Sequence, residues 1–374
     1  CYLTVSCRQN HPEDQQRPPK QIMSCLKRVF YVGIFPVALG VAAWQGWSWW
    51  SWAQSPVVAS DVDQPVQIQI PNGTAAQQIG QDLEAAGLIR STTAWKVWNR
   101  LQGFQKREGG LQAGTYSLSP TQSLPEIADQ IWNGDVIQTS FTIPEGWNRS
   151  QMAESLEAQG LVSADEFLRS TEEIPYAQFP WLPQGLPHLE GFLYPDTYLI
   201  PSEQIDANGI VDVMLLRFEQ VALPAYQQAA SPYSLLEWVN LASIVEKESV
   251  VAEERDTIAG VFARRLREGI SLGSDPTVEY GLGITQTPEN PLTLAQVNTP
   301  NPYNTYRNFG LPPTPIASPG IASLEASLNP PDTEFLYFVA RYDGTHVFSR
   351  SLAEHERAQG QIRDRVDAQL GDDL

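Results

Sequence analysis

Cysteine and histidine are scarce in this chain of 374 residues. No cysteine follows Cys25, so the remaining sequence can hold no disulfide framework, thiolate nucleophile or cysteine-ligated zinc site. The histidines are few and scattered, which argues against a histidine-ligated metal: His11, His188, His346 and His355. The chain also lacks a glycine-rich phosphate loop, a G-x-S-x-G elbow and an H-E-x-x-H motif. We therefore expect no metal and no cofactor.

Positive charge is also in short supply. The chain has 24 Lys and Arg against 43 Asp and Glu, giving a formal net charge of −19. Nucleic-acid binding requires a basic surface, so we do not expect nucleic acid as a partner. The length allows about two or three domains with a substantial core.

The N-terminal region has the pattern of a membrane-targeting segment. Residues 1–28 are expected to form a disordered cytoplasmic tail, with Met23 as a candidate start, because most of them are polar and rich in Pro and Gln. Residues 29–53 carry no charge and are long enough to span a bilayer. Tryptophans crowd the far end of that run, as is typical of the headgroup zone: Trp44, Trp47, Trp49, Trp50 and Trp52.

The distribution of basic residues sets the expected orientation. No Lys or Arg occurs between Arg28 and Arg90, so the positive-inside rule puts the N-terminus in the cytoplasm and the body outside. We expect a single-pass protein of the inner (plasma) membrane with an extracytoplasmic body. The alternative is a cleaved signal peptide ending near Ala59.

An internal repeat follows a short linker over residues 54–64. Residues 68–89 match residues 141–162 without a gap, at an offset of 73 positions. Each copy predicts a strand, a Pro-x-Gly turn, an amphipathic helix and a glycine stop. The two modules are expected to lie side by side in a small α+β unit that binds elongated ligands, unless they are a duplication without binding.

The second half predicts helices, a long loop and a hairpin. Helices are expected over residues 211–223, 234–248 and 253–268, the last of them solvent-exposed. The Pro-rich residues 287–319 are expected to form the wall of a cleft. A hairpin over residues 335–349 and a helix over residues 352–370 close the chain.

Glu248 is the candidate catalytic residue. With about 100° per helical residue, it lies on the same side as Leu241, Ile244 and Val245, whereas Glu246 lies nearly opposite and is expected to be solvated. A carboxylate on an apolar face loses hydration, which raises its pKa and suits it to general acid catalysis. The alternative is a structural glutamate that reaches solvent or a partner arginine.

Other polar residues are candidates for substrate contact. Glu190 and Asp196 are the candidates for a second carboxylate beside that of Glu248. Asp275 precedes Pro276 and could equally cap a helix, and Asn304 could equally form a turn between its two tyrosine neighbours. His346 is expected to be packed within the hairpin. Aromatic and amide groups of this kind suit sugar recognition.

Six motifs in a fixed order carry a family resemblance. They are FLYPDTY (192–198), ASIVEKES (242–249), ERD (254–256), SDPTVEYG (274–281), YNTY (303–306) and GLPPTPIASPG (310–320). Their order and spacing resemble those of the MltG-type (YceG-like) endolytic murein transglycosylases. The resemblance runs from about residue 66 to the C-terminus and includes the anchor, whereas the extension before Met23 has no counterpart.

The resemblance implies an α+β fold with a transmembrane helix. A LysM-like subdomain over residues 65–139 would precede a mixed helical catalytic domain over residues 140–374. The family's catalytic glutamate is the second of its E-K-E motif, which is Glu248 here, although Ser249 replaces the frequent threonine. The implied substrate-binding candidates are Glu190, Tyr194, Asp196, Asp275, Thr277, Tyr303, Asn304 and Tyr306.

The implied activity is cleavage of peptidoglycan glycan strands between N-acetylmuramic acid and N-acetylglucosamine. The substrate's own C6 hydroxyl would attack to give a 1,6-anhydro end, so no second carboxylate is needed. The resemblance also suggests work beside membrane-bound cell-wall synthases, limiting strand elongation. The alternatives are a hydrolase of the same bond and a non-catalytic peptidoglycan-binding scaffold.

Overall fold

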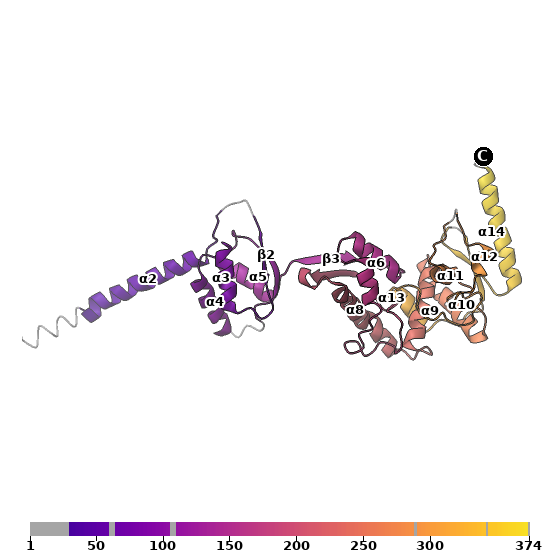
Figure 1. Ribbon diagram of the computed structural model, residues 1–374, viewed down its shortest axis with the longest axis horizontal. Coiled ribbons are helices and arrows are strands. Elements are labelled where there is room, and N and C mark those ends of the chain that lie inside the picture. Colours follow the sequence, from indigo (N-terminus) through magenta and orange to yellow (C-terminus); the bar gives the residue numbers. More distant parts are fainter. Residues whose placement is uncertain (1–29, 60–63, 105–109, 288–289, 342, 373–374) are drawn as a thin grey trace, which may run out of the picture. The chain divides into compact units, whose positions relative to one another are not determined.

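The computed structural model describes residues 30–59, 64–104, 110–287, 290–341 and 343–372. The chain divides after Ile137 into two compact units (Figure 1). Both units mix helices with small antiparallel sheets, which confirms the predicted α+β class. The predicted cytoplasmic tail and the start at Met23 lie outside the described residues.

The first unit begins with a short π-helix, η1 (Phe30–Ile34), that continues into α2 (Phe35–Gln54). Among the described residues, no helix combines the length and the apolar character needed to cross a membrane. The second half of α2 carries Trp, Ser and Gln in place of aliphatic residues. The expected span over residues 29–53 is therefore not supported.

The body of the first unit is a two-stranded sheet with three helices. Strand β1 (Val66–Ile70) pairs antiparallel with β2 (Gly114–Leu118). Apolar side chains of the sheet and helices form one core, in which Trp95 is fully buried and stacks on Trp98 at a ring-centroid distance of 6.1 Å. The helices are α3 (Ala76–Ala85), α4 (Thr92–Phe104) and α5 (Leu124–Asn133).

The internal repeat is confirmed in the backbone. The second copy forms β3 (Gln138–Thr142) and α6 (Arg149–Ala158), as β1 and α3 do in the first copy. The turn and stop glycines of both copies share left-handed conformations, which glycine adopts without a side-chain clash: φ is 79° at Gly73, 74° at Gly146, 70° at Gly87 and 71° at Gly160. The expectation of one small unit is wrong, because the copies belong to different units and pair with different strands, β2 and β4 (Thr197–Pro201).

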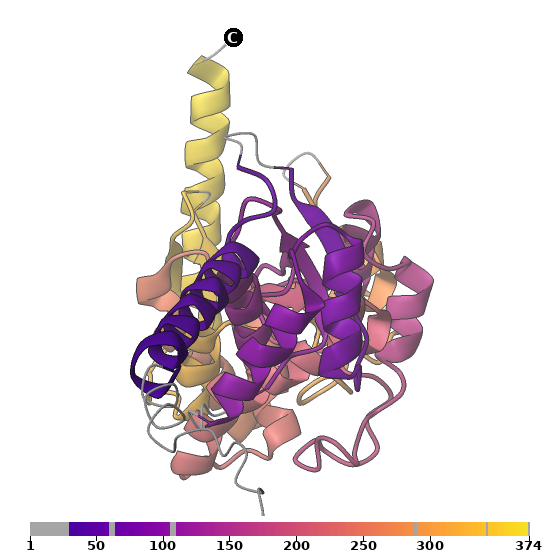
Figure 2. The ribbon, with the colours of Figure 1, turned by 90° about the vertical axis from the view of Figure 1, so that its left-hand side faces the viewer.

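The second unit is mostly helical (Figures 1 and 2), and its last helix follows the predicted hairpin. In both views the last helix, α14, projects away from the rest of this unit. The remaining elements are α7 (Ala164–Ser170), η2 (Ser202–Gln204), α8 (Ala207–Gln228), α9 (Leu235–Glu248), η3 (Ala252–Glu254), α10 (Arg255–Glu268), α11 (Asp275–Leu282), α12 (Leu294–Val297), α13 (Ile321–Leu328), β5 (Tyr337–Ala340), β6 (His346–Ser349) and α14 (Leu352–Asp372).

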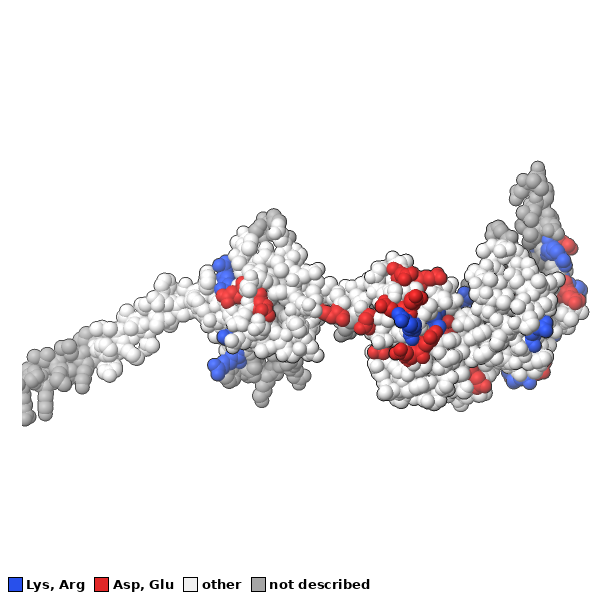
Figure 3. Space-filling model, viewed as in Figure 1, with Lys and Arg blue, Asp and Glu red and all other residues white. Residues whose placement is uncertain are grey.

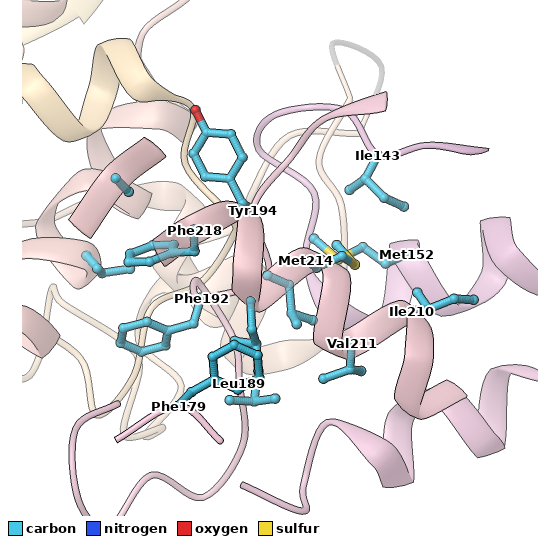
Figure 4. Packing of buried hydrophobic residues seen from close by; sticks show 14 of the residues in the cluster. Ile143, Met152, Phe179, Leu189, Phe192, Tyr194, Ile210, Val211, Met214 and Phe218 are labelled. Carbon is cyan, nitrogen blue, oxygen red and sulfur yellow. The ribbon is translucent and has the colours of Figure 1, made fainter. Parts of the chain in front are cut away.

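Two apolar clusters hold the second unit together. The larger one packs the aromatic turn before β4 against α8, where Phe192 and Phe218 lie 5.5 Å apart between ring centroids (Figure 4). The other packs α9 against α10, whose Ile258 and Phe262 are at most 1% exposed. The prediction of an exposed helix here is wrong, because charged residues at both ends of α10 flank a central apolar run over residues 258–263 that α9 covers.

The Pro-rich segment also packs more closely than predicted. Residues 314–320 are buried, and the backbone N–H of Ile316 donates a 3.1 Å hydrogen bond to Oγ of Ser243 on α9. The Asn240 amide donates to the carbonyl of Pro312 at 2.6 Å. The C-terminal part of the segment is therefore a strap across α9 and not an open cleft wall. On the face in Figure 3, acidic side chains of this unit gather around α6 and α8.

Candidate active site

Glu248 is the last residue of α9. Ser234 is the N-cap of this helix and forms a capping box with Glu237. The side chain of each residue accepts a hydrogen bond from the backbone N–H of the other. The face predicted to be apolar is fully buried, with Leu241, Ile244 and Val245 all 0% exposed. Glu248 itself is half-buried, so it lies at the edge of the core and is partly accessible to solvent.

A serine from a distant segment holds the Glu248 carboxyl. Oγ of Ser274, which is 1% exposed, donates a 2.7 Å hydrogen bond to Oε1 of Glu248. Burial raises the pKa of Glu248 to about 7, the hydrogen bond from Ser274 opposes that rise, and the negative charges of Asp275 and Glu279 add to it. The carboxyl therefore keeps its proton up to neutral pH, as a general acid requires.

The loop before α11 fixes the position of Ser274. The backbone N–H of Ser274 donates a 3.0 Å hydrogen bond to Oγ1 of Thr305, and the carbonyl of Ser274 accepts a 2.6 Å hydrogen bond from Thr277. Thr277 and Thr305 also share a 2.9 Å hydrogen bond. Ser274 is the N-cap of α11, but its side chain makes no capping bond because it is directed to Glu248. Thr277 is thus a buried support of the serine.

Asp275 and Tyr306 form the more exposed edge of this site. The Tyr306 hydroxyl donates a 2.7 Å hydrogen bond to Oδ1 of Asp275. Asp275 is the first residue of α11 and its N-cap is Ser274, so the expectation that Asp275 caps this helix is wrong. Tyr306 is 42% exposed, and its partial burial and the charge of Asp275 raise its pKa. These two residues are accessible to a ligand beside Glu248.

Asn304 and Tyr303 hold the loop. Asn304 is 1% exposed and its amide nitrogen donates to the carbonyls of Val297 and Thr299, both at 2.8 Å. Its Oδ1 accepts from the backbone N–H of Tyr306 at 3.0 Å. The Tyr303 hydroxyl shares a 2.8 Å hydrogen bond with Thr314. The structure therefore favours the turn-forming alternative for Asn304 over substrate binding.

Glu190 is a second buried carboxyl, away from Glu248. It is 2% exposed and accepts hydrogen bonds from the backbone N–H of Arg149, at 3.1 and 3.2 Å, and from the Tyr280 hydroxyl, at 2.9 Å. Burial raises its pKa to about 7. Glu190 thus joins the start of α6 to α11.

Tyr194 and Asp196 stabilise the aromatic turn. Tyr194 is 6% exposed and its carbonyl accepts a hydrogen bond from the Tyr198 hydroxyl. Burial raises the pKa of Tyr194 to about 12. Oδ2 of Asp196 pairs with Nε of Arg217 at 2.6 Å, and Oδ1 accepts from the backbone N–H of Thr197 at 2.7 Å. None of these contacts involves Glu248.

The prediction for Glu246 is wrong. It is half-buried, and its Oε2 accepts a 3.1 Å hydrogen bond from the backbone N–H of Gly320 at the start of α13. The strap over residues 314–320 covers this side of α9, which a helical wheel cannot show. Burial and then the charge of Glu246 raise the pKa of the neighbouring Glu145.

The packed role of His346 is confirmed. His346 is 7% exposed, and Nδ1 lies 2.7 Å from Oε2 of Glu254, which also accepts the backbone N–H of His346 through Oε1 at 3.1 Å. This pair ties the hairpin to the segment that follows Glu248.

Sequence reasoning missed Ser274 and Arg265 as members of the site. Ser274 stands beside Asp275, the residue considered as a helix cap, and Arg265 lies in a helix predicted to face solvent. Arg265 is half-buried, and its charge lowers the pKa of Glu248. A signal for both existed in the separation of only seven residues between Arg265 and Leu272, which places the arginine beside the serine loop.

The fold and the site define a class of protein: a two-unit α+β protein with a half-buried, serine-bonded acid at the end of a core helix. The chain belongs to the YceG-like family, whose model matches residues 68–361. The resemblance expected from the motifs is thereby confirmed.

Named relatives cover most of the chain. It is 28% identical over 316 residues to the endolytic murein transglycosylase of Bacillus subtilis (strain 168), covering 81% of this chain and 86% of the relative. It is 30% identical over 323 residues to the endolytic murein transglycosylase of Streptococcus pneumoniae serotype 2 (strain D39 / NCTC 7466), covering 78% of this chain. The chain spans only 57% of that pneumococcal relative's length.

A crystal structure shares the fold. The crystal structure of a YceG-like protein from Listeria monocytogenes superimposes with a TM-score of 0.50 at 28% sequence identity. The match covers 79% of this chain and 100% of the Listeria chain.

Proposed function

We propose that this protein is an endolytic peptidoglycan transglycosylase in which Glu248 is the general acid and base. The observation that carries the proposal is the Glu248 carboxyl, half-buried, hydrogen-bonded by Ser274 and with its pKa raised to about 7. Membership of the YceG-like family and the names of two relatives support the same reaction class, a carbon–oxygen lyase.

The reaction needs one carboxyl that works twice. Glu248 gives its proton to the bridging oxygen as the bond from C1 of N-acetylmuramic acid to that oxygen breaks. The C6 hydroxyl of the same sugar then attacks C1, and its proton passes to the Glu248 carboxylate. The product is a 1,6-anhydro end, and the enzyme returns to its starting protonation state. A pKa near 7 suits both steps, since neither form of the carboxyl is strongly disfavoured.

The proposed substrate sets the location and partners. Peptidoglycan lies outside the plasma membrane, so the second unit would work on the extracytoplasmic side. Cleavage within nascent glycan strands would limit their elongation, beside the membrane-bound synthases that make them. Among the candidate ligands, Asp275 and Tyr306 suit sugar hydroxyls best because Tyr306 is exposed and bonded to Asp275 next to Glu248.

The test is product analysis on purified sacculi with Glu248→Gln. Gln keeps the shape of the side chain and can still accept from Ser274, but it cannot give up a proton. We expect the wild type to release 1,6-anhydro ends by mass spectrometry, and the variant to release at least about a thousandfold less while it remains folded.

The matched control is Glu246→Gln, two residues earlier in the same motif. Its amide oxygen can still accept from the backbone of Gly320, so cleavage should continue. Reducing ends in place of anhydro ends would identify a hydrolase. Binding to sacculi without any release by the wild type would identify a non-catalytic scaffold.

A further inference from the structure

Arg265 connects the segments that surround Glu248. It lies on α10, and its Nη1 donates a 2.6 Å hydrogen bond to the carbonyl of Leu272, two residues before Ser274. Its Nε donates at 2.6 Å to the carbonyl of Leu336, which directly precedes β5. The guanidinium carbon lies 5.0 Å from the centre of the Tyr337 ring. One planar group therefore fixes both the serine loop and the start of the hairpin.

Gly273, which lies between Leu272 and Ser274, also packs closely against its neighbours. A Cβ atom added to Gly273 would lie 3.6 Å from Nη1 of Arg265 and 3.4 Å from the Tyr306 ring. The guanidinium and the Tyr306 ring therefore both lie close to the backbone of the serine loop at Gly273. Any displacement of Arg265 would move Leu272 and, through it, the residue that bonds Glu248.

The charge of Arg265 also acts on Glu248. Of the charged groups that shift the pKa of Glu248 in the described part of the chain, Asp275 and Glu279 on α11 disfavour its carboxylate, and Arg265 favours it. The effect is mutual: burial lowers the pKa of Arg265, and the charge of Glu248 is among the influences that oppose this fall. Tyr306 also lies near both groups.

We propose that Arg265 is a positioning residue that holds Ser274 against Glu248 and acts as the counter-charge of the Glu248 carboxylate. Its part in turnover rests on the proposed function, since the carboxylate forms when Glu248 has given its proton to the leaving oxygen. Asp275 and Glu279 make that carboxylate costly, and Arg265 opposes them. A lysine could carry the charge but could not donate along two fixed directions.

The test uses the full chain and two substitutions at this position. Arg265→Gln removes the charge, and Arg265→Lys keeps it but loses the planar fork. The control is Arg267→Gln on the same helix, because Arg267 is exposed and pairs with Asp332 at 3.0 Å.

The first readout is the Glu248 pKa itself, measured by NMR of protein labelled with ¹³C at the glutamate carboxyls. The Glu248 signal is identified by its loss in Glu248→Gln. We expect Arg265→Gln to raise this pKa by about one pH unit, and Arg267→Gln to leave it within about 0.2 units. An unchanged Glu248 pKa in Arg265→Gln would overturn the counter-charge.

The second readout is turnover on glycan strands. We expect Arg265→Lys to keep the Glu248 pKa within about half a unit of the wild-type value but to lower kcat roughly tenfold, with little change in KM. Wild-type kcat in Arg265→Lys would overturn the positioning role. If the wild type formed no anhydro product, the proposed function would fail, while the NMR titration would still decide whether Arg265 acts on Glu248.

Discussion

Oγ of Ser274 donates a 2.7 Å hydrogen bond to Oε1 of Glu248 across 26 positions of sequence. The bond joins the loop before α11 to the last residue of α9, and Ser274 is 1% exposed. It stabilises the carboxylate relative to the acid and so opposes the effect of burial on the Glu248 pKa.

Ser274→Ala should therefore raise the Glu248 pKa further. Loss of one hydrogen bond to a carboxylate corresponds to a shift of roughly half to one pH unit. In the proposed mechanism Glu248 must be protonated to act first as an acid, so the high-pH limb of kcat/KM should move upward by that amount. At the same time the carboxyl is held less firmly, so the maximum of kcat should fall.

The measurement is a pH–rate profile on glycan strands from pH 5 to 9. Ser271→Ala, three residues earlier in the same loop, serves as the control and should leave the limb in place. A downward or absent shift in Ser274→Ala would contradict the proposed effect of the hydrogen bond.

Glu248→Gln should make the protein more stable above neutral pH. The folded-state pKa of about 7 lies above the ordinary value of 4.5, so the folded state binds the proton more tightly than the unfolded state does. The free energy of unfolding of the wild type is therefore highest below about pH 4.5 and falls as the pH rises toward 7. Gln does not titrate, so this loss does not occur in the variant. Its free energy of unfolding at pH 8 should exceed that of the wild type by about 1–3 kcal/mol, a range that allows for partial solvent screening.

Urea unfolding at pH 4 and pH 8 measures this difference. At pH 4 both proteins carry a neutral group at position 248 and should have nearly equal free energies of unfolding. An equal difference at both pH values would show that the gain comes from packing and not from titration.

The sequence predicted that Glu248 shares the apolar side of its helix, but it did not predict the surroundings of that carboxyl. Glu248 could be assigned because the helical period relates it to Leu241, Ile244 and Val245 on the same element, and all three are buried. The fate of Glu246 could not be assigned in this way. The group that meets it, the backbone N–H of Gly320, comes from 74 positions further along the chain.

The same distinction applies to the fold. The repeat, the hairpin and most helices follow from local patterns, and the paired glycines of the two copies share their backbone conformations. The burial of α10 and the strap over residues 314–320 depend on contacts between distant segments. Because charged residues lie at both ends of α10, its composition alone did not indicate the apolar centre.

Tyr280→Phe should destabilise the protein in a pH-dependent way. The Tyr280 hydroxyl donates a 2.9 Å hydrogen bond to Glu190, which is 2% exposed and has a pKa raised to about 7. At pH 8 Glu190 is mostly ionised, so the loss should cost about 1.5–3 kcal/mol, as for other hydrogen bonds to charged groups. At pH 5 Glu190 is protonated and the cost should fall to about 1 kcal/mol.

Tyr226→Phe is a matched control for the loss of a tyrosine hydroxyl. The Tyr226 hydroxyl donates to the carbonyl of Tyr233 at 2.9 Å, a bond between neutral groups. Its loss should cost about 0.5–1.5 kcal/mol at either pH. If both variants showed the same pH dependence in chemical unfolding, the charged state of Glu190 would not be the cause.

Gly260→Ala should test the packing of the helix that carries Arg265. A Cβ at Gly260 would lie 2.6 Å from the backbone carbonyl oxygen of Pro331, and a backbone group cannot rotate away as a side chain can. The helix or the segment at Pro331 would have to shift, so we expect a loss of about 1–3 kcal/mol. The intrinsic helix preference of alanine over glycine offsets at most about 1 kcal/mol of this.

Gly360→Ala on α14 separates the two effects. No atom lies within 4 Å of the added Cβ at that position, so the helix preference alone should operate and stability should rise by up to about 1 kcal/mol. Calorimetric unfolding of the two variants should therefore give shifts of opposite sign. Equal upward shifts would mean that α10 does not pack closely against Pro331.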